Sequence, residues 1–332
     1  MTLQTKFLIK EHIIDSIAIL IPCFDEAITI GKVIDDFKAQ LPQATIYVYD
    51  NNSKDQTGAI ALEHGAVVRL EIRQGKGNVV RQMFRDIDAD YYILVDGDDT
   101  YPAEMVKTLL EPVQNGLADI VIGDRLSNNS YYRENRRSFH NFGNSLVCLL
   151  IKWLYGVDIR DAMSGYRVFN KVFVKTVPLL AKGFEIEVEM DIHAIDNNWR
   201  IHEIPIEYRD RPAGSYSKLS TFRDGWKVLM TILSLFKDFK PLVLFSFVAI
   251  LFVLVGLGLG ITVVFDFIQT GLVERFPTAI LAVALIIVGM LSLTCGVILD
   301  TIVKANHKEY EVSVHQAIAQ IKRSKNKDTL GD

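Results

Sequence analysis

Cysteine is scarce in this sequence, and the few copies form no recognisable motif. Cys23, Cys148 and Cys295 are spread over 332 residues, and none stands in a C-x-x-C or Cys/His metal spacing. The seven histidines contain no H-x-x-x-H pair either. The sequence therefore gives no support for a zinc site, and an odd number of widely spaced cysteines favours a reducing compartment over a disulfide framework.

A basic excess is also absent, and the first residues do not show the pattern of a signal peptide. Lys and Arg number 36 against 40 Asp and Glu, which gives a formal net charge of −4 and argues against a nucleic-acid partner. Residues 1–16 lack an uninterrupted apolar stretch and a small-residue cleavage site, so we expect no signal peptide. We find no internal repeat and no low-complexity tract.

Charge is missing from two long runs near the C-terminus. Residues 241–265 and 276–299 contain no Asp, Glu, Lys or Arg. Each run is long enough to cross a hydrocarbon core of about 30 Å at about 1.5 Å per residue. A buried hairpin of soluble helices is the weaker interpretation, because apolar runs of this length seldom occur in soluble cores. We predict transmembrane helices at 241–265 and 276–300, joined by a connector at 266–275.

Basic residues indicate the orientation of these two helices. They precede the first helix and follow the second, whereas the connector holds Arg275 alone. By the positive-inside tendency, residues 1–217 and the tail at 301–332 are predicted to be cytoplasmic, and the connector extracytoplasmic. The flanking basic residues are Arg223, Lys227, Lys237, Lys240, Lys304, Lys308, Lys322, Arg323, Lys325 and Lys327.

The segment 218–240 has the pattern of an amphipathic helix. Phe222, Trp226, Leu229 and Leu233 follow one another in steps of three or four, with Lys and Arg interspersed. Such a helix can lie in the headgroup region of a membrane. An ordinary helix packed on its own domain has the same pattern, but the position directly before a membrane span favours the interface.

The first 125 residues alternate between buried strands and helices. Short connections between them predict a doubly wound, mostly parallel sheet of the α/β class, with helices on both faces. In such sheets, ligands bind beyond the carboxyl ends of the strands. The predicted strands are 16–24, 45–50, 66–71, 91–96 and 118–125, and the predicted helices are 26–41, 55–65, 77–87 and 103–116.

Three acids follow the fourth predicted strand in ILVDGDDTYP: Asp96, Asp98 and Asp99. A solvated turn is one explanation, since Asp and Gly are common in turns. A cation is the other, because an Asp-x-Asp pair at a strand end can direct two carboxylates toward one hard divalent ion that also bridges substrate phosphates. Taken alone, the stretch leaves both explanations open.

Seven stretches in order resemble a known family. The segments ILIPCFDEAITI, VYDNNSKDQT, RQGKGNVVRQ, LVDGDDTYP, IGDR, DAMSGYRVF and RPAGSYSKLSTFRDG are similar to those of family 2 glycosyltransferases with the GT-A fold. Over roughly residues 15–240, followed by two spans, the chain resembles the polyprenyl-phosphate glycosyltransferases, the group of dolichyl-phosphate mannose synthase and the bacterial undecaprenyl-phosphate glucosyl- and GlcNAc-transferases. The QxxRW signature of processive synthases is absent.

The resemblance implies a donor site for a nucleotide sugar. Asp96 and Asp98 would bind Mg²⁺ or Mn²⁺, which bridges the donor diphosphate, while Asp99 would be a neighbour facing solvent. By itself, Asp50 with the residues after it also reads as a polar turn, and QGKG at 74–77 as a plain glycine turn. The donor-binding residues implied are Pro22, Phe24, Glu26, Asp50, Gly75, Lys76, Asp96 and Asp98.

The acceptor side follows from the chemistry of a phosphate. A phosphate monoester has a second pKa near 6 and is already ionised at pH 7, so it needs cations to hold it more than a base to activate it. Arginines are the candidates for that contact, because guanidinium binds phosphate through parallel donors: Arg125 after the fifth predicted strand, and one of Arg133, Arg136 and Arg137, of which the resemblance points to Arg137. The resemblance places Ser164 in the adjacent turn. The resemblance also places Asp161 near the acceptor and the donor sugar, where we expect it to orient one of them; a general base and a helix cap are the alternatives.

Two further segments carry candidate residues. Glu187 or Glu189 could face the donor sugar, although a solvated helix face explains them as well. The Gly/Ser-containing stretch 211–222, with Arg211, Ser217 and Lys218, is expected to be a lid that closes on the diphosphate.

Together these features predict the inverting transfer of one sugar from a UDP-sugar to undecaprenyl phosphate at the bacterial cytoplasmic membrane. Glucose is the first choice of sugar and GlcNAc the second, and the resemblance suggests a tetramer. A nucleotidyltransferase would need a Gly-rich Lys loop at the first strand, where this chain has PCFDE. A catalytically silent membrane-bound nucleotide-sugar sensor or scaffold is the other class of function considered.

Overall fold

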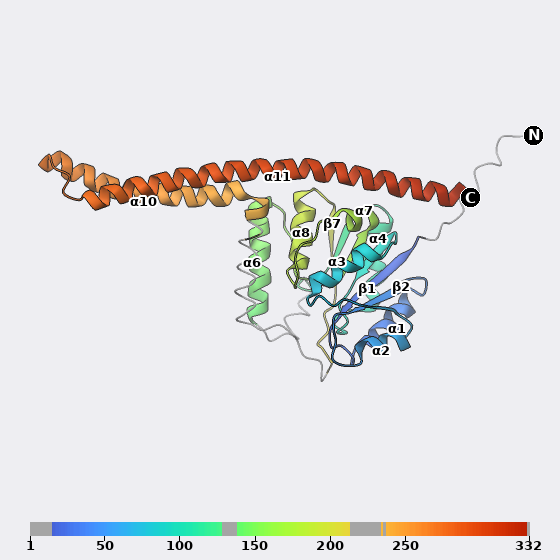
Figure 1. Ribbon diagram of the computed structural model, residues 1–332. Helices are drawn as coiled ribbons and strands as arrows, with labels where there is room; N and C mark the ends of the chain where they lie inside the picture. Colours follow the sequence, from blue (N-terminus) through green and yellow to red (C-terminus); the bar gives the residue numbers. More distant parts are fainter. Residues whose placement is uncertain (1–14, 128–137, 213–233, 235–236, 331–332) are drawn as a thin grey trace, which may run out of the picture. The chain divides into compact units, whose positions relative to one another are not determined.

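The structure, a computed structural model, describes residues 15–127, 138–212, 234 and 237–330. The chain divides into two compact units, Met1–Thr221 and Phe222–Asp332 (Figure 1). The amphipathic helix predicted at 218–240 lies almost entirely outside the described residues.

The first unit is built on one mixed sheet. Among the described residues it has seven strands in the order β3-β2-β1-β4-β6-β5-β7. Neighbouring strands are parallel except at β6, which runs antiparallel to both β4 and β5. The prediction of a mostly parallel α/β sheet is therefore confirmed. The strands are β1 (Ile17–Cys23), β2 (Thr45–Asp50), β3 (Val67–Leu70), β4 (Tyr91–Leu94), β5 (Ile120–Asp124), β6 (Arg167–Asn170) and β7 (Ile201–Pro205).

The helices of this unit connect the strands and cover the sheet. The four helices predicted before residue 117 are present, although the first begins only at Ile30 and the fourth begins as a 3₁₀ turn. The strands and helices between residues 126 and 205 were not predicted. The helices are α1 (Ile30–Gln40), α2 (Thr57–Glu63), α3 (Lys76–Asp86), η1 (Ala103–Met105), α4 (Val106–Gln114), α6 (Ser138–Tyr155), α7 (Lys171–Thr176) and α8 (Ile186–Asp196).

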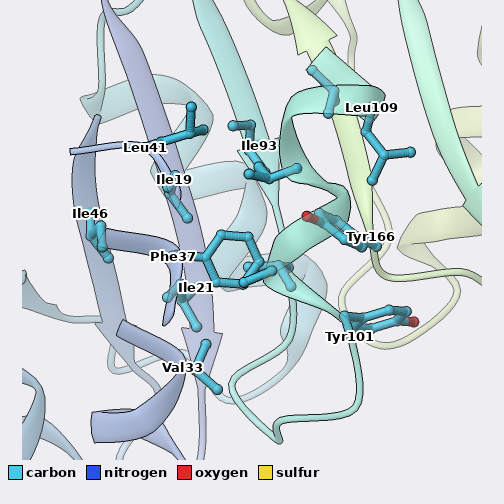
Figure 2. Packing of buried hydrophobic residues seen from close by; sticks show 14 of the residues in the cluster. Ile19, Ile21, Val33, Phe37, Leu41, Ile46, Ile93, Tyr101, Leu109 and Tyr166 are labelled. Carbon is cyan, nitrogen blue, oxygen red and sulfur yellow. The ribbon is translucent and has the colours of Figure 1, made fainter. Parts of the chain in front are cut away.

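The alternation of side chains along β1 explains why both faces of the sheet are covered. Ile19 and Ile21 belong to one buried cluster, which α1 and α4 complete, whereas Leu20 belongs to a second cluster with α3, α7 and α8. Figure 2 shows Phe37 of α1 reaching toward Tyr166, and the two rings meet edge to face at 5.9 Å. Burial on both faces is the reason that the strands read as continuous apolar runs.

The sheet brings polar residues from distant parts of the chain to one edge. Because β1, β2, β4 and β5 run in the same direction, the residues that follow Cys23, Asp50, Leu94 and Asp124 lie beyond the same ends of the strands. Backbone hydrogen bonds continue past the regular pairing, as from Asn51 N–H to Cys23 O at 2.8 Å. The predicted site residues that follow these four strands therefore lie at one edge of the sheet.

The second unit is a pair of long helices, α10 (Pro241–Thr270) and α11 (Phe276–Leu330). Both are long and apolar enough to cross a membrane, with mean hydropathies of 2.9 and 2.6 over their most apolar windows. Only 11% and 17% of those windows are buried, as expected for helices that face lipid and not for core helices of a soluble protein. Beyond the predicted span, α11 continues as one helix into the C-terminal tail.

Small residues allow α10 and α11 to approach each other closely. A β-carbon on Gly256 would lie 2.8 Å from Ile286 Cγ1 and 2.9 Å from the Ala282 carbonyl oxygen. A β-carbon on Gly289 would lie 2.8 Å from Val253 Cγ2. Such close backbone approach is the usual basis of helix packing in lipid, where the hydrophobic effect gives no preference for contact.

Candidate functional site

The acidic turn after β4 holds one buried carboxylate and one partly exposed carboxylate. The Asp98 side chain is only 6% exposed, and it accepts a hydrogen bond of 2.6 Å from the Thr100 hydroxyl. Burial and the nearby Asp96 carboxylate raise the pKa of Asp98, and the Arg211 guanidinium, whose Nη2 lies 2.5 Å from Asp98 Oδ2, opposes them. The Asp96 and Asp98 carboxylates thus lie close together, and Arg211, from the segment after β7, pairs with Asp98.

Asp99 differs from its expected role. It adopts a left-handed backbone conformation (φ 59°), and its carboxylate pairs with Lys32 Nζ of α1 at 2.7 Å. The side chain is only 12% exposed, so the expectation that Asp99 faces solvent is wrong. The left-handed turn directs Asp99 toward α1 and leaves Asp96 and Asp98 to the site.

Asp96 pairs with Lys76, the first residue of α3. The Lys76 ammonium lies 2.5 Å from Asp96 Oδ1 and 2.5 Å from Glu187 Oε1 of α8, and the lysine side chain is 9% exposed. Burial alone would lower the pKa of Lys76, but the two carboxylates outweigh burial and raise it. Lys76 is therefore a fixed positive charge beside the acidic turn. Of the two glutamates singled out in the sequence, Glu187 is the one that reaches this centre.

Glycine is required at the turn that places Lys76. Gly75 has φ 125°, a conformation that L side chains rarely adopt, and a β-carbon there would lie 2.1 Å from the Lys182 carbonyl oxygen. The Gly77 N–H donates to the same carbonyl at 3.1 Å. The turn at 74–77 thus packs directly against the segment before α8, and α8 is the helix that carries Glu187.

Asp96 and Asp98 fit a small divalent ion by their chemistry. They are two hard oxygen ligands, two positions apart, on one turn, and each is already paired with a side-chain cation. Among the described residues, no group of three or more His, Cys, Asp or Glu forms a complete cage. This matches a site of the magnesium type, in which one or two carboxylates share the ion with substrate phosphates and water.

Arg125 and Asp161 form a buried pair at the end of β5. Arg125 Nε and Nη2 donate to the two Asp161 oxygens at 2.7 and 2.8 Å, and the Arg125 backbone N–H adds a third bond of 3.1 Å. Asp161 is fully buried and Arg125 is 7% exposed. Burial would raise the pKa of the Asp161 carboxyl, but the Arg125 charge and hydrogen bonds outweigh it and lower that pKa.

The Tyr101 hydroxyl joins this pair to the acidic turn. It accepts a hydrogen bond from the Gly165 backbone N–H at 2.8 Å and another from Arg125 Nη1 at 3.4 Å. A β-carbon on Gly165 would lie 2.5 Å from Asp96 Oδ2, so the backbone of this turn touches the acidic carboxylate directly. The buried Tyr101 hydroxyl and the Gly165 turn therefore connect the acidic turn to Arg125.

Ser164 and Arg167 hold the turn in place from behind. The Ser164 hydroxyl is fully buried and donates to the Gly123 carbonyl oxygen at 2.6 Å, so here it fixes the turn and does not face a ligand. Arg167 donates to the carbonyl oxygens of Ala162 and Ser164 at 3.0 and 2.8 Å and pairs with Asp191 of α8.

The expected nucleotide side is organised by Asn51. Its side chain donates to the carbonyl oxygens of Glu71 and Arg73 and accepts from the Gly75 N–H at 2.7 Å. Asp50 accepts from the Ser53 N–H at 2.8 Å. These bonds tie the end of β2 to the glycine turn at 74–77.

The remaining candidates lie around the same edge or outside the described residues. Pro22 lies in β1, and Phe24 directly follows that strand. The Glu26 N–H donates to the Thr57 hydroxyl at 2.8 Å. Glu189 accepts backbone hydrogen bonds from residues 180 and 181. Arg137, Ser217 and Lys218 lie outside the described residues, so their predicted roles stay predictions.

Two positioning residues were missed in the sequence, although both stand inside quoted motifs. Tyr101 belongs to LVDGDDTYP and Arg167 to DAMSGYRVF. A buried tyrosine hydroxyl and a buried arginine need partners, but the sequence does not show which partners are near. Asn51 was treated only as part of a polar turn for the same reason.

Comparisons with known proteins identify the family. Residues 18–176 match the model for glycosyl transferase family 2. The chain is 32% identical over 299 residues to glycosyltransferase AglJ of Haloferax volcanii, across 89% of this chain and 96% of that protein. It is 28% identical over 218 residues to the polyprenol monophosphomannose synthase of Mycolicibacterium smegmatis, across 61% of this chain and 80% of that one.

A solved structure supports the same fold. Glucosyl-3-phosphoglycerate synthase from Mycobacterium tuberculosis, in complex with UDP, superposes with a TM-score of 0.55 at 20% identity, over 67% of this chain and 80% of that one. The predicted GT-A architecture is confirmed by this likeness together with the sheet order. With the family match and the acidic turn in place, the chain belongs to glycosyl transferase family 2 and is a glycosyltransferase.

Proposed function

We propose that this enzyme transfers one sugar, with inversion, from a UDP-sugar to undecaprenyl phosphate, giving a lipid-linked sugar for cell-envelope polysaccharide modification. One observation carries the proposal: the Tyr101 hydroxyl and Gly165 join the acidic pair Asp96/Asp98 to the Arg125–Asp161 pair. A site for a metal-bound diphosphate thus adjoins a guanidinium able to hold a phosphate acceptor.

On the donor side, Asp96 and Asp98 would hold Mg²⁺ or Mn²⁺. When bound, that ion offsets the negative charge that develops on the leaving nucleoside diphosphate. Lys76 supplies a second positive charge beside the same turn. Pro22, Phe24, Glu26 and Asp50 would bound the base and ribose, and Asn51 would keep the glycine turn in place beneath them.

On the acceptor side, the low pKa of Asp161 favours an orienting role. A polyprenyl phosphate is ionised at neutral pH and does not need to lose a proton to attack. A carboxylate held by Arg125 through two hydrogen bonds is a weak proton acceptor, because protonation would break that pair. Asp161 would then fix the direction in which Arg125 presents its remaining N–H groups, with Arg137 as a second contact.

The anchor suits a lipid acceptor. We propose two membrane passes, α10 and α11, with the catalytic unit and the tail in the cytoplasm, an interfacial helix at 218–240 and a homotetramer. The apolar character of both helices supports the two passes, and the relative named polyprenol monophosphomannose synthase supports a lipid acceptor. Glucose remains the first choice of sugar and GlcNAc the second, while the name of that relative makes mannose the alternative to test.

The test is release of the nucleoside diphosphate, UDP or GDP, by the full-length protein in detergent with Mn²⁺ and undecaprenyl phosphate, across a panel of UDP-sugars and GDP-mannose. We expect turnover with one donor that requires lipid and metal and that Asp98→Ala abolishes. Turnover with GDP-mannose alone would correct the donor. Nucleotide binding without turnover for any donor would instead favour a sensor or scaffold.

A further inference from the structure

Each of the two carboxylates expected to bind the metal already carries a side-chain cation. Lys76 Nζ lies 2.5 Å from Asp96 Oδ1, and Arg211 Nη2 lies 2.5 Å from Asp98 Oδ2. The two cations come from different segments, one from the start of α3 and the other from the stretch that follows β7. The site thus balances most of its own negative charge before any ligand enters.

The balance has a physical reason. Asp98 and Glu187 are 6% and 4% exposed at their side chains, and together with Asp96 they would place three carboxylates in one partly buried region. Buried charges without partners are strongly unfavourable, so cations are needed as long as the metal is absent. Lys76 and Arg211 meet that need.

The two cations are not held equally firmly. Lys76 bridges two carboxylates, is 9% exposed, and follows a glycine turn packed against the Lys182 carbonyl oxygen. Arg211 is 27% exposed and lies two residues beyond Arg209, whose backbone N–H bonds to the Thr100 carbonyl oxygen at 3.0 Å. Arg211 is therefore the cation that can leave with less rearrangement.

A divalent ion bound by Asp98 would compete with the guanidinium for the same carboxylate, whose Oδ1 already accepts a hydrogen bond from the Thr100 hydroxyl at 2.6 Å. A magnesium-type ion binds a carboxylate oxygen at about 2.0–2.1 Å, and Arg211 Nη2 now lies 2.5 Å from Asp98 Oδ2. Two positive charges at one carboxylate repel each other, so a bound ion would weaken or break the Arg211 contact. A donor diphosphate offers the released guanidinium a new anionic partner with matching geometry.

We propose that Arg211 is an exchangeable counterion of Asp98, displaced when the divalent ion binds and transferred to the donor diphosphate. This deepens the proposed function and rests on it. The ion alone binds weakly because it must displace Arg211 from Asp98. With the nucleotide present, the diphosphate takes the place of Asp98 as the anion that Arg211 contacts, so metal and nucleotide strengthen each other's binding by the same factor.

The experiment measures Mn²⁺ binding and not turnover. Free Mn²⁺ is followed by electron paramagnetic resonance during titration of the full-length protein in detergent, with and without UDP. Wild type is compared with Arg211→Gln, Arg211→Lys and Arg209→Gln. Arg209 is the matched control, because its side chain pairs with the exposed Glu104 at 3.1 Å and not with the acidic turn. Asp98→Ala identifies the Mn²⁺ that binds at this site.

For Arg211→Gln we expect Mn²⁺ alone to bind about tenfold more tightly than in wild type, the scale of one hydrogen bond to a charged group. The strengthening by UDP should shrink by a similar factor. Arg211→Lys should stay nearer to wild type and Arg209→Gln should equal it. If Arg211→Gln leaves the Mn²⁺ affinity without UDP unchanged or weakens it, Arg211 is no counterion of Asp98 and the proposal is overturned.

The proposed function can fail separately. If the exchange signature is seen but no donor and lipid pair gives turnover, the counterion role stands as a property of a binding protein and the transferase proposal fails. If turnover occurs with normal metal dependence but Arg211→Gln leaves Mn²⁺ binding unchanged, the transferase proposal stands and the counterion proposal fails.

Discussion

Arg125 holds the Asp161 carboxylate through two side-chain hydrogen bonds, of 2.7 and 2.8 Å, and a third from its backbone N–H of 3.1 Å. The two residues come from segments 36 positions apart, and Asp161 is fully buried. The pair therefore joins the end of β5 to the turn before β6, and each partner is the reason that the other can be buried as an ion.

Removal of one partner should cost more than removal of a surface ion pair. Asp161→Ala leaves Arg125 buried without its counterion, and we expect a loss of about 3–5 kcal/mol in the free energy of unfolding. Thermal unfolding in detergent, followed by intrinsic fluorescence, measures it as a lower midpoint. Lys152→Ala is the control, because its ion pair with Asp158 is exposed on both sides and should contribute little. Equal shifts for the two variants would contradict the assignment of Asp161 to a buried pair.

The pH dependence of the reaction should report the acceptor phosphate and not Asp161. Because Arg125 lowers the pKa of Asp161, this carboxylate stays ionised above its ordinary value of about 3.9 and gains a proton only below it. Stability from the pair is therefore present throughout the neutral range and is lost only as the pH falls through the folded-state pKa. The acceptor phosphate, in contrast, takes up its second proton near pH 6.

We expect kcat/KM to fall on the acid side near pH 6 in wild type and at the same pH in Asp161→Asn, which turns over more slowly. The measurement is the initial rate of UDP release from pH 5 to 9 at fixed metal. A disappearance of the acid limb in Asp161→Asn would assign a general-base role to this residue.

The Tyr101 hydroxyl is predicted to act as a positioning group. Tyr101→Phe keeps the aromatic packing against Tyr166 and Tyr208, at 5.5 and 5.9 Å, but removes the acceptor shared by Gly165 and Arg125. We expect stability to fall by about 1–2 kcal/mol, since a buried N–H loses its partner. We expect kcat to fall more than tenfold, because both sides of the site shift.

A split of the kinetic constants separates this role from a purely structural one. A general loss of folded protein lowers the apparent kcat and leaves both KM values unchanged. A displaced Gly165 turn and Arg125 should also raise the KM for the polyprenyl phosphate. Tyr208→Phe keeps the ring beside Arg125 and serves as the comparison.

Much of the first half of the catalytic unit could be predicted from local pattern. The runs at 17–23 and 91–94 are apolar because the sheet is covered on both faces, and the acids that follow Leu94 stand where open α/β sheets bind ligands. The acidic turn and Lys76 were therefore recognised from position and resemblance together.

The second half of the catalytic unit could not be predicted from local pattern, because charged residues are buried there. The strand β6 begins with Arg167, which is 0% exposed, and α8 contains the buried residues Glu187, Asp191 and His193. A pattern of apolar and polar letters assigns such residues to the surface. Only the partners, Asp191 for Arg167 and Lys76 for Glu187, make their burial possible, and these partners are far apart in the sequence.

The glycines of α10 give a prediction for the unit formed by α10 and α11, with a control two residues away. Gly256 faces α11, where a β-carbon would lie 2.8 Å from Ile286 and 2.9 Å from the Ala282 carbonyl oxygen, whereas Gly258 has nothing within 4 Å. Gly256→Leu must therefore push the helices apart, at a cost of about 1–3 kcal/mol. Gly258→Leu adds an apolar side chain on a face suited to lipid and should be neutral.

Size-exclusion chromatography of the detergent-solubilised protein after heating measures the effect: Gly256→Leu should lose its monodisperse peak at a lower temperature than wild type and Gly258→Leu. Equal behaviour of the two variants would show that this helix contact does not stabilise the hairpin.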